Sequence, residues 1–118
     1  MISKSMNDEV FMIMEHLLEI DISHLIDAIN SKNIEFDSGV MSVSYLSKFN
    51  RSTKINNEVI SNMSNARRDE PIIISVISEA GWIIDGNHRL TRRQLDEYVN
   101  CDVVAIPPNI LLEYSVCL

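Results

Sequence analysis

The sequence predicts an α+β domain: a small mixed sheet with helices, preceded by an amino-terminal helical segment. Apolar residues recur at helical spacing through the first thirty positions. A short, β-branched apolar run at 72–77 then predicts a strand buried on both faces. Strand-like and helix-like stretches alternate from there to residue 106. At 118 residues the chain is long enough for one domain with a single core.

Composition favours a globular, cytoplasmic protein. Hydrophobic residues make up 46% and charged residues 23%, which is ordinary for a folded domain. No apolar run approaches the roughly 20 residues of a membrane span, and we expect no signal peptide. Cys101 and Cys117 have no metal or redox spacing, so we expect two reduced thiols.

The net charge of −7 is unevenly distributed. It disfavours general binding to nucleic acid, which depends on phosphate neutralisation by Lys and Arg. Residues 1–37 hold eight acids and two lysines, whereas five of the six arginines lie within 67–93. This separation suits either a local anion pocket or an acidic face that meets a basic protein.

Two helices, or one bent helix, are predicted before residue 31. The first spans Asn7–Glu19 and the second begins near Asp21 and ends near Asn30. We interpret His16 and His24 as surface or edge-of-core residues. The apolar positions of the two stretches are Val10, Phe11, Met14, Leu17, Leu18, Ile22, Leu25, Ile26 and Ile29.

The middle of the chain predicts a turn at 37–39, a strand at 40–45 and a helix over 54–65. After the strand at 72–77, residues 78–81 form a hairpin loop and 81–84 the returning strand. A helix then continues to about Asn100, with Leu90, Leu95 and Val99 among its core-facing residues. Residues 103–106 form a last strand before Pro107, and the apolar segment 110–118 is left as strand or helix.

The candidate site is the connection between the returning strand and its helix. Gly86 can adopt positive φ or allow close approach to the backbone, and Asn87 is a suitable helix N-cap. Backbone N–H groups and the helix dipole at such an end favour an anion, and we expect a phosphate. His88 would be a neutral donor to the anion, and Arg89 a bidentate ligand.

Three further residues complete this interpretation. Asp85 could act as a general base, or could hold His88 or Arg89. Arg92 lies one turn on and could extend the pocket, while Arg93 could be simply solvated. The alternative is that Asp85-Gly86-Asn87 is only a tight, capped connection with His88 and Arg89 on the surface.

The stretch Asp85-Gly86-Asn87-His88-Arg89-Leu90 resembles the motif of the ParB/sulfiredoxin-like superfamily, a glycine followed by polar residues and an Arg at a helix start. The similarity covers roughly residues 40–107 and leaves the acidic segment 1–37 outside. It implies that Gly86, Asn87, His88 and Arg89 cradle a phosphate of a nucleotide, with Mg²⁺ where the nucleotide needs it. The family's reductases place Cys where this chain has Asn87, so their redox chemistry is not expected.

Two functions therefore remain open. The first is a phosphate- or nucleotide-binding domain that could be a phosphoryl-transfer enzyme or a hydrolase, although no complete catalytic set is visible. The second is an acidic immunity or antitoxin-type protein that neutralises a basic toxin such as a nuclease, with the motif a structural remnant. The second predicts an interface that includes Glu15, Glu19 and Asp27. Neither interpretation includes a metal site or a membrane.

Overall fold

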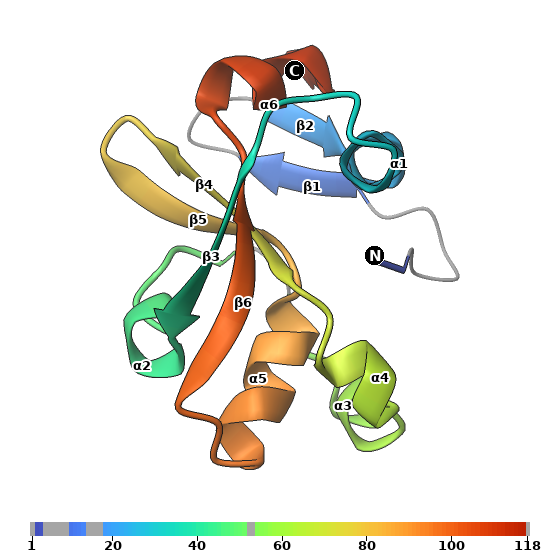
Figure 1. The fold of residues 1–118 in the computed structure, drawn as a ribbon, viewed down its shortest axis with the longest axis vertical. Helices are drawn as coiled ribbons and strands as arrows, with labels where there is room; N and C mark the ends of the chain where they lie inside the picture. The colour runs from blue at the N-terminus through green and yellow to red at the C-terminus, as the bar shows by residue number, and fades with distance from the viewer. Residues whose placement is uncertain (1, 4–9, 14–17, 52–53, 118) are drawn as a thin grey trace.

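The computed structural model describes residues 2–3, 10–13, 18–51 and 54–117, and it contains two sheets (Figure 1). The larger sheet has the strand order β3-β6-β4-β5, and the smaller has the order β1-β2-β7. In the larger sheet β4 and β6 are parallel while the other pairs are antiparallel, so the predicted α+β class with a mixed sheet is confirmed. The strands are β1 (Val10–Ile13), β2 (Leu18–Asp21), β3 (Asp37–Ser42), β4 (Ile72–Ile77), β5 (Ala80–Asp85), β6 (Asn100–Ala105) and β7 (Ser115–Cys117).

The helices lie at the two ends of the larger sheet. Figure 1 shows α1 and α6 beside the smaller sheet at one end, and α2 to α5 at the other. They are α1 (Ile22–Asn30), α2 (Val43–Leu46), α3 (Asn57–Ser61), α4 (Asn65–Arg68), α5 (Asn87–Leu95) and α6 (Pro108–Glu113). Among the described residues, no helix has the length and apolar composition needed to cross a lipid bilayer.

Residues 72–74 of β4 are buried on both faces of the larger sheet, which explains the three successive isoleucines there. Ser75 is buried with its hydroxyl donating to the Ile106 carbonyl, and Val76 is 52% exposed. Ile73 and Ile77 face a cluster that includes Leu25 and Ile26 of α1. Ile72 and Ile74 face a second cluster, built with α2 and α5. A strand buried on both faces needs apolar side chains at successive positions, as the sequence predicted.

The predicted helix over 7–19 is wrong where the structure describes it, because 10–13 and 18–21 are strands. Glu19 is half-buried and the next residue, Ile20, is fully buried, which is an alternation typical of a strand rather than of a helix. β2 pairs with β1 and with β7, and β7 lies at the other end of the chain. Pairing with so distant a strand leaves no pattern in the sequence near β2. His16, Glu15, Met6 and Met14 lie outside the described residues. The second predicted helix is confirmed as α1, capped by Asp21 through the N–H of His24.

Three other predicted elements are shifted or divided. β3 begins at Asp37, inside the expected turn, and ends where Ser42 caps α2 by accepting from the Tyr45 N–H. The expected helix over 54–65 is two short helices, α3 and α4, each begun by its own cap at Asn56 and Ser64. The unassigned carboxyl-terminal segment forms α6 and β7.

The hairpin between β4 and β5 has a two-residue turn rather than the expected loop over 78–81. Ser78 and Glu79 both have positive φ, 50° and 68°, which matches the right-handed twist of the flanking strands. Gly81 already belongs to β5, where a Cβ would lie 2.8 Å from the Phe49 ring. Its small size, rather than a turn conformation, accounts for the glycine at this position.

Helix α5 ends earlier than predicted, at Leu95 rather than near Asn100. Glu97 has positive φ, 61°, and the chain leaves the helix there. Leu95 and Val99 are consequently 67% and 75% exposed, so their predicted core positions are wrong. The side chain that α5 buries at that end is Arg93.

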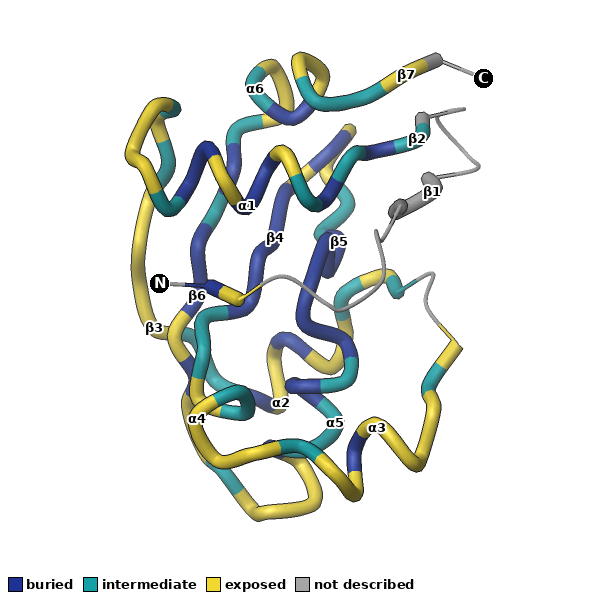
Figure 2. Tube along the Cα trace, turned by 90° about the vertical axis from the view of Figure 1, so that its right-hand side faces the viewer, coloured by how far each residue is buried: buried dark blue, intermediate teal, exposed yellow. Residues whose placement is uncertain are grey.

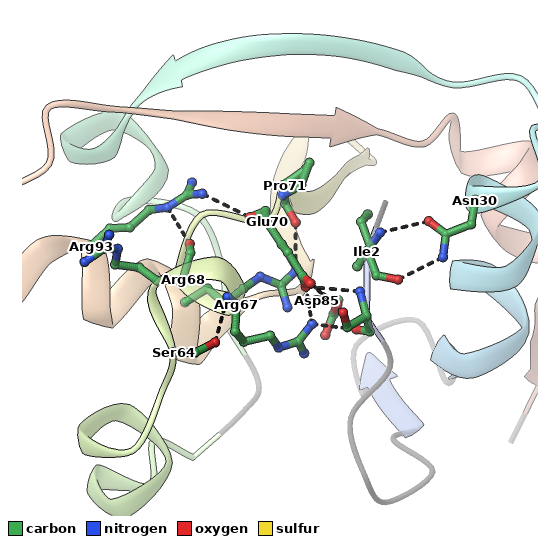
Figure 3. Close-up of polar contacts among 11 residues, drawn as sticks. Ile2, Asn30, Ser64, Arg67, Arg68, Glu70, Pro71, Asp85 and Arg93 are labelled. Atoms are coloured by element: carbon green, nitrogen blue, oxygen red, sulfur yellow. Dashed lines mark hydrogen bonds and ion pairs between the residues drawn. The ribbon is translucent and has the colours of Figure 1, made fainter.

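Residues 2 and 3 are held by side chains rather than by a strand (Figure 3). The Asn30 side chain makes two hydrogen bonds to the backbone of Ile2. It accepts from the Ile2 N–H at 2.9 Å and donates to the Ile2 carbonyl oxygen at 2.8 Å. Glu70 accepts from the N–H and hydroxyl of Ser3, while Arg67 donates to the Ser3 carbonyl. The Ile2 side chain is buried in the core cluster that includes α1.

Candidate anion-binding site at the start of α5

Gly86 forms the junction between β5 and α5. Its φ of 107° and ψ of 17° place it in the left-handed region, which glycine adopts without the cost that a Cβ imposes. A Cβ at this position would also lie 3.1 Å from Arg89 Nη2 and 3.1 Å from Ile72 Cγ1. Because glycine has no side chain, it supplies no side-chain cap to the first turn of α5. Asn87 is the first helical residue rather than the expected N-cap.

Arg89 points inward from this junction. It is 2% exposed, and its Nη2 donates to the Pro71 carbonyl at 2.8 Å and to Asp85 Oδ2 at 3.2 Å. Burial lowers the pKa of Arg89, and the neighbouring Asp85 carboxylate opposes that effect. Through these two bonds Arg89, in the first turn of α5, is connected to Asp85 at the end of β5 and to Pro71, the residue before β4. The Arg89 guanidinium therefore packs against the Gly86 turn from the interior and does not lie at the surface.

Arg51 is the residue that the sequence interpretation missed. Its Nε donates to Asn87 Oδ1 at 2.9 Å, and its Nη2 donates to the Asn87 carbonyl at 2.8 Å and to Thr91 Oγ1 at 3.0 Å. Partial burial lowers the pKa of Arg51. A guanidinium therefore lies at the first turn of α5, supplied by a segment 36 positions away from Asn87. A single Arg in a loop carries no local pattern that could have identified it.

His88 is half-buried beside the same segment. Its Nε2 accepts a hydrogen bond from the Asn56 N–H at 3.0 Å. Nε2 therefore carries no proton in this arrangement, and a neutral ring has its proton on Nδ1. This agrees with the helix dipole, which disfavours a protonated His in a first turn.

Arg92 and Arg93 are engaged away from the Gly86 turn. Arg92 donates to Asp96 Oδ2 at 2.9 Å and to the Ile60 carbonyl at 2.6 Å. The expectation that Arg93 is solvated is wrong, because it is 2% exposed and donates to the carbonyl oxygens of Arg68 and Glu70 (Figure 3). It holds the chain between α4 and β4 against α5.

A network of arginines thus surrounds α5. Arg68 donates to Asp69 and Asp96 and lies 4.9 Å from the centre of the Tyr98 ring. All six arginines of the chain make hydrogen bonds in this region. Four of them pair with carboxylates, which are Asp69, Glu70, Asp85 and Asp96. Arg51 and Arg93 bond to uncharged groups instead. Arg89 Nε and Arg93 Nη1 are buried without a hydrogen-bond acceptor among the described residues. The network has more positive than negative groups in a chain of net charge −7.

The residues of the alternative interface lie on different elements. Asp27 is exposed on α1, Glu19 is half-buried on β2, and Glu15 lies outside the described residues. Within the described ranges, no three His, Cys, Asp or Glu side chains come close enough together to hold a metal ion. Cys101 is a buried free thiol whose pKa is raised by burial.

Comparison of the chain with protein-family models, curated proteins and solved structures finds no match. The fold and site thus define a class only in structural terms. It is an α+β domain in which a strand passes through a left-handed glycine into a helix surrounded by arginines.

Proposed function

We propose that this domain binds a phosphate group, as part of a nucleotide or a similar small molecule, at the amino-terminal end of α5. The ligand would accept from backbone N–H groups of the first helical turn. Asn87, His88 and Arg51 supply the polar side chains around it. A phosphate at such a helix end is favoured by the N–H groups and the helix dipole together.

The observation that carries this proposal is the position of Arg51 at a helix start that begins with left-handed Gly86. The Arg51 Nε and Nη2 atoms are engaged with Asn87 and Thr91, which orients the guanidinium over the first turn. The resemblance of 85–90 to the ParB/sulfiredoxin-like motif supports the same ligand class. Arg89 is then a positioning residue, since its guanidinium lies beneath Gly86.

The test is thermal stability with ATP, ADP, CTP, GTP and pyrophosphate, each with Mg²⁺. A ligand that binds only the folded state raises the midpoint by mass action. We expect a shift with at least one of them in the native chain, and its loss in Arg51→Ala and in His88→Ala. Arg68→Ala is the matched control, since Arg68 bonds to Asp96 at the opposite end of α5. An equal shift in Arg51→Ala would contradict the proposal.

The negative charge left unpaired among the described surface residues favours a second function. The arginines are engaged within the network, whereas seven exposed carboxylates have no ion pair among the described residues. These are Glu35, Asp37, Glu58, Glu79, Glu97, Asp102 and Glu113. Such a surface suits an immunity or antitoxin-type protein that neutralises a basic partner. Its test is salt-sensitive binding to a basic protein, weakened by charge reversal among these carboxylates, as in Glu35→Lys, and unchanged in Arg51→Ala.

A further inference from the structure

The free edge of the larger sheet is formed by β3. Figure 2 shows this strand at the side of the molecule with most of its length exposed. We propose that β3 is the docking site for an extended, basic segment of a protein partner, which adds to the sheet as a further strand. This inference rests on the second proposed function, for which it names the surface and the form of the partner.

The hydrogen-bond pattern shows which backbone groups of β3 point outward. The Val43 N–H donates to the Val99 carbonyl at 2.9 Å, and these two residues continue the β3–β6 register. Bonded pairs alternate along an antiparallel ladder, so Met41 and Gly39 also bond to β6. Ser38 and Val40 therefore direct their N–H and C=O groups away from β6. Among the described residues, these groups have no partner elsewhere in the chain.

This edge lacks the features that usually prevent strand addition. β3 contains no proline and no lysine, and its register with β6 is continuous over six pairs. The opposite edge of the same sheet is covered at its middle, because Asn50 bonds to the backbone of Gly81 and Ile83 on β5. The edge strands of the smaller sheet, β1 and β7, are only four and three residues long.

Charge determines which strand would pair there. Glu35, Asp37 and Asp102 are exposed around β3 and make no ion pair with any described residue. Residues 33–47 contain no Lys or Arg. Val40 is 65% exposed, and Asp37 lies three positions before it in β3, so the apolar side chain and the carboxylate lie on opposite faces of the sheet. A partner strand with alternating basic and apolar residues places its basic side chains on the face of Asp37 and its apolar side chains on the face of Val40.

A second copy of the chain is a poorer occupant of this edge. Each copy has a net charge of −7, and pairing of two β3 strands would bring two sets of acids together. Like charges placed opposite each other in a sheet are destabilising. The occupant that complements the edge is therefore a basic segment from another protein.

The test uses a blocked hexapeptide of alternating lysine and valine, with a glutamate–valine peptide as its control. Amide hydrogen exchange in the native chain is followed residue by residue by NMR. We expect the lysine peptide to slow exchange of the Ser38 and Val40 amides, with little change at Gly39 and Met41, which already bond to β6. Binding should weaken as salt is raised.

Two variants separate backbone pairing from charge. Ser38→Pro removes an outward N–H without removing a bond to β6, and it should weaken the peptide about fivefold or more. Asp37→Asn keeps the backbone intact and should weaken it about two- to threefold. Glu113→Gln, a carboxylate on α6, is the control and should leave the affinity unchanged.

Several outcomes would overturn the inference. Salt-sensitive binding of the lysine peptide without protection of Ser38 and Val40 would place the partner elsewhere, while the second function would stand. Equal binding of the glutamate peptide would refute the charge argument. Protection of both amides by dimerisation without peptide would replace the partner by a second copy. If a basic folded protein binds and the lysine peptide does not, strand addition is refuted while the second function stands.

Discussion

Arg89 Nη2 lies 3.2 Å from Asp85 Oδ2, and the two side chains are only 2% and 6% exposed. A buried pair of this kind is costly to break, because removal of one partner leaves an uncompensated charge. We expect Arg89→Met to lower the free energy of unfolding by about 3–5 kcal/mol, measured by urea denaturation. The double variant Asp85→Leu with Arg89→Met should recover part of this loss. A double variant less stable than Arg89→Met would contradict the account of the pair.

Gly86 and Gly39 provide a matched comparison of two glycines. Gly86→Ala would place a Cβ at positive φ and 3.1 Å from Arg89 Nη2, so we expect a loss of about 1–3 kcal/mol. Gly39 has normal φ and no atom within 4 Å of an added Cβ, so Gly39→Ala should be close to neutral. The comparison is made by thermal and urea denaturation. Equal effects at the two positions would show that Gly86 is not a required feature of the turn.

The hairpin turn offers a stabilising change. Ser78 and Glu79 both occupy the left-handed region, which Asn and Gly adopt more readily. The double substitution Ser78→Asn with Glu79→Gly should therefore raise the free energy of unfolding by about 1 kcal/mol. The midpoint of urea denaturation reports this change. A decrease in stability would show that one of the native side chains contributes more than its backbone conformation costs.

Glu70 links residue 3 to the arginine network and makes stability depend on pH. Burial alone would raise the pKa of Glu70, but hydrogen bonds from Ser3 and Arg67 outweigh it, and the pKa is lowered overall. The unfolded chain then binds the proton more readily, so this contribution is present above the ordinary pKa of about 4.3 and is lost as the pH falls through the lowered value. Glu70→Gln should reduce the fall in stability between about pH 5 and pH 3. Identical pH profiles for the two proteins would contradict the role given to Glu70.

Local sequence predicted the elements whose signals are local. The apolar run of β4 and the helical spacing of α1 were visible in the sequence, as was the glycine before α5. The amino-terminal strands were mistaken for a helix because β2 pairs with β7 at the other end of the chain. Arg51 was missed and Arg93 was misassigned because their acceptors belong to residues distant in sequence. An Arg that donates to backbone carbonyls has no counterpart charge in the sequence to reveal it.

The phosphate site is tested most directly by an NMR titration of the native chain with pyrophosphate and Mg²⁺. We expect saturable shifts of the Asn87, His88 and Arg89 amides, together with the Arg51 side-chain Nε–H, and their loss in Arg51→Ala. Amides near Arg68, at the other end of α5, should move little. Shifts that do not saturate, or that spread evenly over the arginine network, would contradict a phosphate site at the start of α5.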